Sequence, residues 1–242
     1  MSNATMDALI RRLQTTSAID DEDVELIGAL PMDLRTLGPN QHVVRDGERS
    51  TACCLLAEGF CVRSKTTWEG RRQILSIHIP GEIPDLQSLY LYVMDHDLVA
   101  VTECEVGYIP HTSLQDMVRR RPNIAAVLWR HTLIDAAMFR EWIVNVGQRP
   151  ATSRLAHIVV ELRARLKVID RAEGSRVDMP LTQEQIGEAM GITPIHANRI
   201  IKQLREEGVL EFQRGYVTVL DEDKLEELAH FDDRYLHLKP SQ

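Results

Sequence analysis

The chain has 242 residues, of which 44% are hydrophobic and 26% are charged, and its formal net charge is −8. The length allows two modest domains, and the composition is that of an ordinary globular protein. No apolar run approaches the roughly 20 residues of a membrane-spanning helix, and the N-terminus has no basic segment followed by an apolar core, so we expect a cytoplasmic protein without a membrane span or a secretory signal.

The first predicted elements are helical, and a long β-rich region follows them. Residues 6–30 have a helical pattern that breaks at Thr15–Ser17, and Pro31 ends it. From Leu34 to Ile109, short segments rich in Val, Ile, Leu and Cys alternate with turn sequences such as GPN, DGE and PGE. Turn signals at intervals of about ten residues predict a small antiparallel barrel or sandwich.

The β-rich region contains the four cysteines of the chain, Cys53, Cys54, Cys61 and Cys104. No pair has Cys-x-x-Cys spacing, and adjacent residues of a strand face opposite sides of the sheet. We expect these residues to be small buried hydrophobic side chains. A metal or cluster site and a redox-sensing thiol are the alternatives.

A long amphipathic helix is predicted between Pro122 and Gly147, because no Gly or Pro interrupts this stretch. Its length of about 24 residues corresponds to about 36 Å. Apolar side chains recur at spacings of three or four. The stripe runs from Ile124 to Val146, and the residues expected to form the dimer contact are Leu128, His131, Ile134, Met138 and Trp142. Such a rod often pairs with a second copy, so we expect a homodimer held by this helix. The alternative is a helix packed wholly inside its own domain.

Residues 181–215 read LTQEQIGEAMGITPIHANRIIKQLREEGVLEFQRG, which is the pattern of two short helices, a tight turn and a β-hairpin. Thr182 and Thr193 are the expected caps of the two helices, Pro194 suits the first turn of the second helix, and Gly191 suits the turn between them. This pattern predicts a winged helix-turn-helix whose second helix enters the major groove of DNA. A winged helix used for protein contacts is the alternative.

The outer face of the second helix and its surroundings supply the predicted DNA contacts. Base contacts are expected from Ile195, His196, Asn198 and Arg199, of which Arg199 suits bidentate pairing with guanine. Phosphate contacts, which fix register rather than sequence, are expected from Thr182, Gln183, Thr193, Lys202 and Arg214.

The negative net charge does not exclude DNA, because the acidic residues are concentrated elsewhere in the chain. Residues 149–215 contain 11 Lys and Arg against 9 Asp and Glu, whereas residues 1–148 contain 14 against 20. Local charge decides the contact with phosphates, while net charge mostly governs solubility and long-range steering.

Nearly the whole chain resembles the Crp/Fnr family of bacterial transcription regulators. The resemblance rests on LGPNQHVVRDGE, CLLAEGFCVRS, GRRQILSIHIPGEI, the long helix, QRPATSRLAHIVVEL and the helix-turn-helix with NRIIKQLREEGVL. It implies an α+β protein with an N-terminal double-stranded β-roll of the cupin or jelly-roll-like cyclic-nucleotide-binding type, a long dimerisation helix and a C-terminal winged helix-turn-helix. The implied domains are residues 1–121 for the N-terminal helices and sensor roll, 122–148 for the dimerisation helix and 149–242 for the DNA-binding domain. The implied partners are promoter DNA with a palindromic site and RNA polymerase.

The recognition helix departs from the pattern of the family. Its members usually carry a Glu and an Arg there for base contacts. Arg199 matches the Arg, but Ile195 stands at the position of the Glu, with His196 beside it. We therefore expect an operator that differs from the standard half-site of the family.

The sensor region also departs from the cyclic-nucleotide sensors of the family. In those proteins the loop after PGE supplies a Glu for the ribose and then an Arg-Ser or Arg-Thr pair for the phosphate. Here the pair falls near Met94 and Asp95, and no Lys or Arg lies between Glu82 and Glu105. Carboxylates repel a phosphate at close range, so we expect no tight binding of cyclic AMP.

An effector of unknown identity stays possible, and we expect no metal and no cofactor. The candidate effector pocket consists of Glu82, Asp85, Leu86, Asp95 and Asp97, in which Asp85 could replace the ribose-binding acid. No cysteine precedes Cys53, which disfavours the iron–sulfur cluster of the oxygen-sensing members. His78 is expected to be structural rather than a haem ligand.

No catalytic motif is found in the sequence. It has no Gly-x-Ser-x-Gly elbow, no phosphate-binding glycine loop and no His-Glu-x-x-His zinc motif. We therefore expect a DNA-binding regulator and not an enzyme. The alternative is a small-molecule sensor that acts mainly through protein–protein contacts.

Overall fold

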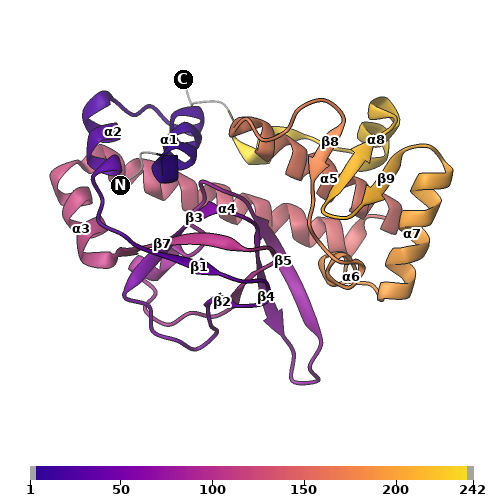
Figure 1. Cartoon of the computed structure of the whole chain (residues 1–242), viewed down its shortest axis with the longest axis horizontal. Helices are drawn as coiled ribbons and strands as arrows, with labels where there is room; N and C mark the ends of the chain where they lie inside the picture. Colours follow the sequence, from indigo (N-terminus) through magenta and orange to yellow (C-terminus); the bar gives the residue numbers. More distant parts are fainter. Residues whose placement is uncertain (1–3, 239–242) are drawn as a thin grey trace. The chain divides into compact units, whose positions relative to one another are not determined.

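The computed structural model describes residues 4–238, which form two compact units (Figure 1). One unit extends to Lys65 and continues from Ile77 to Ala137, and the other consists of Thr66–Ser76 and Met138–Leu236. The long helix α4 (Pro122–Gln148) occupies the residues expected of a dimerisation helix. The division between the units falls inside this helix and not at its ends.

Two antiparallel sheets form the β-rich region, as the sequence predicts. The three-stranded sheet has the order β1 (Asp33–Leu37), β7 (Cys104–Pro110), β3 (Ala52–Glu58). The four-stranded sheet has the order β2 (His42–Val44), β6 (Asp97–Ala100), β4 (Cys61–Thr66), β5 (Arg72–His78). One core cluster takes side chains from both sheets, among them Leu56 on β3 and Leu98 on β6.

The four cysteines are free thiols buried in this region. Cys54, Cys61 and Cys104 belong to the core cluster shared by the two sheets. Burial raises the pKa of all three thiols. They pack as small hydrophobic side chains, which is the role that their spacing predicts.

A second core cluster lies on the other face of the three-stranded sheet, under the helices. Leu55 belongs to this cluster and its neighbour Leu56 to the first, because successive side chains of a strand point to opposite faces. The cluster is covered by α1 (Ala4–Thr16), α2 (Asp21–Gly28), the short 3₁₀ helix η1 (Leu86–Leu89), α3 (His111–Arg120) and the first half of α4.

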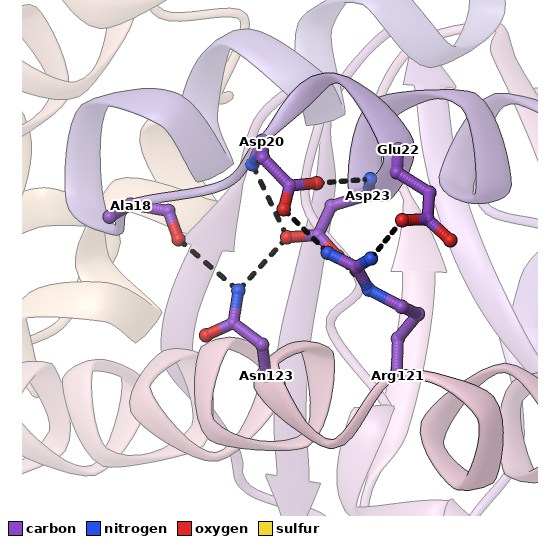
Figure 2. A network of polar contacts seen from close by, with 6 residues as sticks. All are labelled: Ala18, Asp20, Glu22, Asp23, Arg121 and Asn123. Atoms are coloured by element: carbon purple, nitrogen blue, oxygen red, sulfur yellow. Dashed lines mark hydrogen bonds and ion pairs between the residues drawn. The ribbon is translucent and has the colours of Figure 1, made fainter.

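A polar network joins α2 to the start of α4 (Figure 2). Asp20 caps α2 by accepting the amide of Asp23 at 2.8 Å. Arg121 donates to Asp20 at 2.6 Å and to the buried Asp23 at 2.9 Å, and it also pairs with Glu22. Asn123, in the first turn of α4, donates to Asp23 at 2.9 Å. Asp20 and Asp23, which form the capping box of α2, therefore also hold the start of α4 through Arg121 and Asn123.

Helix α4 has the predicted period, but its predicted stripe packs inside the chain. Ile134, Met138 and Trp142 are buried, as is Leu128 in the second core cluster. His131 Nε2 lies 3.2 Å from Thr16 Oγ1, and burial lowers the pKa of this imidazole to about 3. Leu128, Ile134, Met138 and Trp142 therefore pack within their own chain, which is the alternative considered above, and His131 is half-buried.

The opposite side of α4 carries the exposed apolar side chains. They are Trp129, Leu133, Ile143 and Val144. A period of 3.6 residues places all four on one side of the helix, away from the buried stripe. In the first unit, Trp129 and Leu128 line an apolar groove of about 450 Å³ together with Leu86, Leu89, Leu91 and Val118.

The second unit contains the predicted winged helix. Its elements are α5 (Ala151–Val168), α6 (Gln183–Met190), α7 (Pro194–Glu206), α8 (Glu222–Ala229), the 3₁₀ helix η2 (Asp233–Leu236) and a sheet of order β8 (Arg176–Asp178), β10 (Tyr216–Val219), β9 (Leu210–Gln213). Buried Glu161 on α5 accepts from Trp142 Nε1 at 3.1 Å and from the Tyr235 hydroxyl at 2.8 Å. Within residues 4–238, no helix is long and apolar enough to cross a membrane.

Candidate nucleic-acid interface

The turn between α6 and α7 is built from residues with special backbone requirements. Gly191 adopts a left-handed conformation with φ of 68° and ends α6, as a C-terminal glycine commonly does. A Cβ on Gly187 would lie 2.9 Å from the carbonyl oxygen of Ile192, so only glycine permits this close approach. Pro194 occupies the first turn of α7, where a missing amide hydrogen costs nothing.

Helix α7 buries one face and exposes the other, as the sequence predicts. Ala197, Ile200 and Leu204 are buried against the rest of the unit. After α7 in the sequence, β9 and β10 form an antiparallel hairpin whose turn contains Arg214 and Gly215. This hairpin is the wing of the winged helix.

The exposed face of α7 is formed by residues at positions i, i+3, i+4 and i+7, which are neighbours on a helix surface. They are Ile195, Asn198, Arg199 and Lys202, all exposed, and His196 beside them is half-buried. No Asp or Glu occurs between Glu188 and Glu206. From Ile195 to Lys202 the face therefore presents cationic, amide and apolar groups, and its first carboxylate is Glu206 at the C-terminal end of α7.

Asn198 is oriented by a residue of the preceding helix. Its Nδ2 donates to Oε1 of Gln183, on α6, at 2.8 Å. This bond leaves Oδ1 and the second hydrogen of Nδ2 available on Asn198, and the amide hydrogens available on Gln183. Asn198, which is predicted to contact a base, and Gln183, which is predicted to contact a phosphate, are therefore hydrogen-bonded to each other across the two helices.

The two capping threonines keep a donor for a further partner. The hydroxyl of Thr182 accepts the amide of Gln185 at 3.2 Å, and the hydroxyl of Thr193 accepts the amide of His196 at 3.3 Å. A hydroxyl has two acceptor sites and one donor, so its hydrogen stays available in both residues.

The three cationic residues predicted to contact DNA differ in whether they already pair with a carboxylate. Lys202 Nζ lies 3.6 Å from Glu206 Oε1, one turn further along α7. Among the described residues, Arg199 and Arg214 make neither a hydrogen bond nor an ion pair, and both are exposed. Their guanidinium groups are therefore free to bind a base edge or a phosphate.

In the sensor region, Glu82 is already paired within the chain. Arg12 Nη1, from α1, lies 3.0 Å from Glu82 Oε1, and His78 Nδ1 lies 2.7 Å from Oε2, with all three side chains buried. Burial lowers the pKa of His78. Because a carboxylate oxygen accepts, Nδ1 of His78 is the donor in this contact. A Cβ on Gly81 would lie 2.7 Å from the backbone of Ala8, which shows how closely α1 covers the PGE turn.

The other residues predicted for an effector pocket have separate surroundings. Asp85 Oδ1 accepts the amide of Cys54 at 2.7 Å, and burial raises the pKa of Asp85 to about 6. Leu86 belongs to the core cluster under the helices. Asp95 is exposed and pairs with His96 at 2.7 Å, while Asp97 accepts the amide of Asp46 at 3.0 Å. The assignment of these residues to an effector stays a prediction.

Sequence reasoning missed the cations of this region because they come from distant elements. Arg12 precedes Glu82 by seventy residues. Arg63, buried on β4, donates from Nη1 to Asp135 on α4 at 3.0 Å and from Nη2 to the carbonyl of Pro84. The strand of Arg63 also contains Ser64 and Lys65, so its sequence does not single out Arg63, and no local pattern identifies the partner of Arg63.

Comparison with known proteins agrees with both parts of the chain. Residues 34–121 match the family described as a cyclic nucleotide-binding domain, and residues 153–228 match the Crp-like helix-turn-helix domain. The transcriptional activator protein FnrL of Cereibacter sphaeroides is 23% identical over 233 residues, covering 93% of this chain and 92% of that protein. The transcriptional activatory protein AadR of Rhodopseudomonas palustris is 24% identical over 223 residues, covering 91% and 90%.

The solved structure of FixK2 from Bradyrhizobium japonicum has the same fold. Its TM-score is 0.74 at 21% identity, and the match covers 82% of this chain and 98% of that one. A β-roll of the cyclic-nucleotide-binding type joined to a winged helix defines the class of two-domain, DNA-binding transcription regulators. Within that class, the chain belongs to the Crp/Fnr family.

Proposed function

We propose that the chain regulates transcription as a homodimer that reads a palindromic operator with two copies of α7. The observation that carries this proposal is the N-terminal part of the exposed face of α7, which has no acidic residue before Glu206 and where Arg199 is unpaired among the described residues and Asn198 is held by Gln183. Arg199 and Asn198 contact base edges, with His196 and Ile195 beside them. Thr182, Gln183, Thr193, Lys202 and Arg214 contact phosphates.

The pairing surface of the proposed dimer is the exposed side of α4. Trp129 is 68% exposed and Leu133 is 52% exposed, and the adjoining apolar groove has a volume of about 450 Å³. A long helix with an exposed apolar side buries it by pairing with the same side of a second copy. Helix α4 therefore remains the dimerisation helix, but the pairing face is the side opposite the stripe predicted from the sequence.

The sensor roll has no tight cyclic AMP site in this proposal. Asp85, which would replace the ribose-binding acid, is buried and accepts the amide of Cys54, and the carboxylate of Glu82 is paired with Arg12 and His78. An effector of another class stays open. Transcription regulation by this chain involves promoter DNA and RNA polymerase as partners and takes place in the bacterial cytoplasm.

Selection of bound duplexes from a random pool tests the proposal. We expect inverted half-sites whose centres lie about one helical turn, or ~34 Å, apart. Affinity should fall steeply with salt, because phosphate contacts release counterions. Arg199→Ala should weaken binding to the selected duplex, with dimer mass unchanged. Failure to enrich any duplex, or a loss of dimer mass in Arg199→Ala, contradicts this role of α7.

A further inference from the structure

Ile195 is an apolar side chain on the face of α7 proposed to contact DNA. It is 79% exposed, more than any other Ile, Leu or Val among the described residues. It occupies the second position of α7, directly after Pro194. The buried residues of α7 are Ala197, Ile200 and Leu204, so Ile195 lies outside the packed face of its helix.

The surroundings of Ile195 place it where base edges are read. The N-terminal residues of a recognition helix approach the base edges in the major groove. Asn198 and Arg199 follow Ile195 at i+3 and i+4 and are its neighbours on the helix surface. A large apolar group is thus flanked by two side chains that hydrogen-bond bases.

The major groove offers one apolar group, the C5-methyl of thymine. An isoleucine cannot hydrogen-bond, and it would remove the donors and acceptors of any other base from water without replacing their partners. We propose that Ile195 selects a thymine in each half-site through contact with its methyl group. This inference rests on the proposed function, because it requires that α7 enters the major groove.

Replacing thymine by uracil isolates this contact, because uracil lacks only the methyl group. In the selected duplex, each thymine of the half-site is exchanged in turn, symmetrically in both half-sites. At one position we expect the wild-type affinity to fall about fourfold per half-site, the equivalent of ~0.8 kcal/mol for one buried methyl group. Ile195→Val keeps a branched apolar side chain and should keep this response.

Ile195→Ala should bind the thymine and uracil duplexes equally at that position. Leu220→Ala is the matched control, because Leu220 is an exposed aliphatic residue of the same unit outside α7, and it should respond as the wild type does. The inference is overturned by a half-site without thymine, by equal wild-type affinity for every uracil duplex, or by an undiminished response in Ile195→Ala.

The outcomes also separate this inference from the proposed function. If a palindromic duplex is enriched and Arg199→Ala weakens its binding, the proposed function holds, and the uracil series alone decides the role of Ile195. If no duplex is enriched, or Arg199→Ala binds as tightly as the wild type, the proposed role of α7 fails, and the role of Ile195 fails with it.

Discussion

Arg12 Nη1 lies 3.0 Å from Glu82 Oε1, and both side chains are buried between α1 and the PGE turn. Removing one partner of a buried pair leaves an uncompensated charge. We expect Arg12→Met to lower the free energy of unfolding by about 3–5 kcal/mol in urea denaturation. Arg12→Met combined with Glu82→Gln should cost less than the sum of the single changes.

The neighbouring Arg11 provides the control for this pair. It is exposed on the same helix, and Arg11→Met should change the free energy of unfolding by no more than about 0.5 kcal/mol. Strict additivity of Arg12→Met and Glu82→Gln would show that the two side chains are not coupled.

Cyclic AMP should not stabilise the protein, because Met94 and Asp95 stand where the phosphate-binding pair would fall and no Lys or Arg lies between Glu82 and Glu105. A ligand present at 100 times its dissociation constant would add about 2.7 kcal/mol. For a chain of this size, that gain corresponds to a rise in the melting midpoint of roughly 5–10 °C. We expect no rise in a thermal melt with millimolar cyclic AMP, and a rise of several degrees would contradict the assignment.

The exposed side of α4 should carry the dimer contact. Leu133→Glu introduces a charge into this surface, and we expect the mass measured by light scattering to fall from that of a dimer to that of a monomer. Leu220→Glu is matched to it, because Leu133 and Leu220 are each 52% exposed, and it should remain dimeric. A wild-type monomer, or a dimeric Leu133→Glu variant, would refute this surface.

Asp85 should make stability depend on pH. Burial raises its pKa from 3.8 to about 6, so the folded chain keeps a proton that the unfolded chain has released between these values. Stability is therefore lost as pH rises through this window, by about 3 kcal/mol in all. Asp85→Asn keeps an oxygen for the amide of Cys54 and does not titrate.

The difference between Asp85→Asn and the wild type in the free energy of unfolding should therefore grow in favour of the variant from about pH 4 to about pH 7. Asp46→Asn, at an exposed aspartate, is the control for the substitution of a carboxylate by an amide. A difference that does not vary with pH would mean that Asp85 has the same pKa in the folded and unfolded chains and would contradict this prediction.

The thiols should be inert in the folded protein. All four cysteines are buried, and burial raises the pKa of Cys54 and Cys61 well above the ordinary value. Since the thiolate is the reactive form, a thiol reagent should label none of them in native buffer and all of them in denaturant. Rapid labelling of one thiol in the native state would reopen the possibility of a redox-sensing cysteine.

The winged helix could be predicted closely because its sequence signals are local. Thr182, Gly191 and Thr193 mark the ends of helices, and Ala197, Ile200 and Leu204 give the phase of α7. The stripe of α4 shows the limit of such reasoning. Its period correctly grouped Ile134, Met138 and Trp142 on one side, but periodicity does not tell whether a side faces a partner or the chain's own core.

The interior of the sensor region could not be predicted for a different reason. Arg12 and Arg63 meet Glu82 and Asp135 across about seventy residues of sequence. Such pairs depend on how the elements pack, and no spacing rule for helices or strands covers them. No Lys or Arg lies between Glu82 and Glu105, but the fold brings Arg12 of α1 to Glu82.

The pairing of Lys202 with Glu206 affects how this chain should respond to ionic strength. A phosphate that takes Lys202 must first separate it from its carboxylate, so one electrostatic contact is exchanged for another. Arg199 and Arg214 have no carboxylate partner among the described residues, so they can contact DNA without breaking an ion pair. Glu206→Gln would remove the ion pair of Lys202 before DNA binds. The affinity for every duplex should then rise, while the preference for the operator over other sequences stays the same.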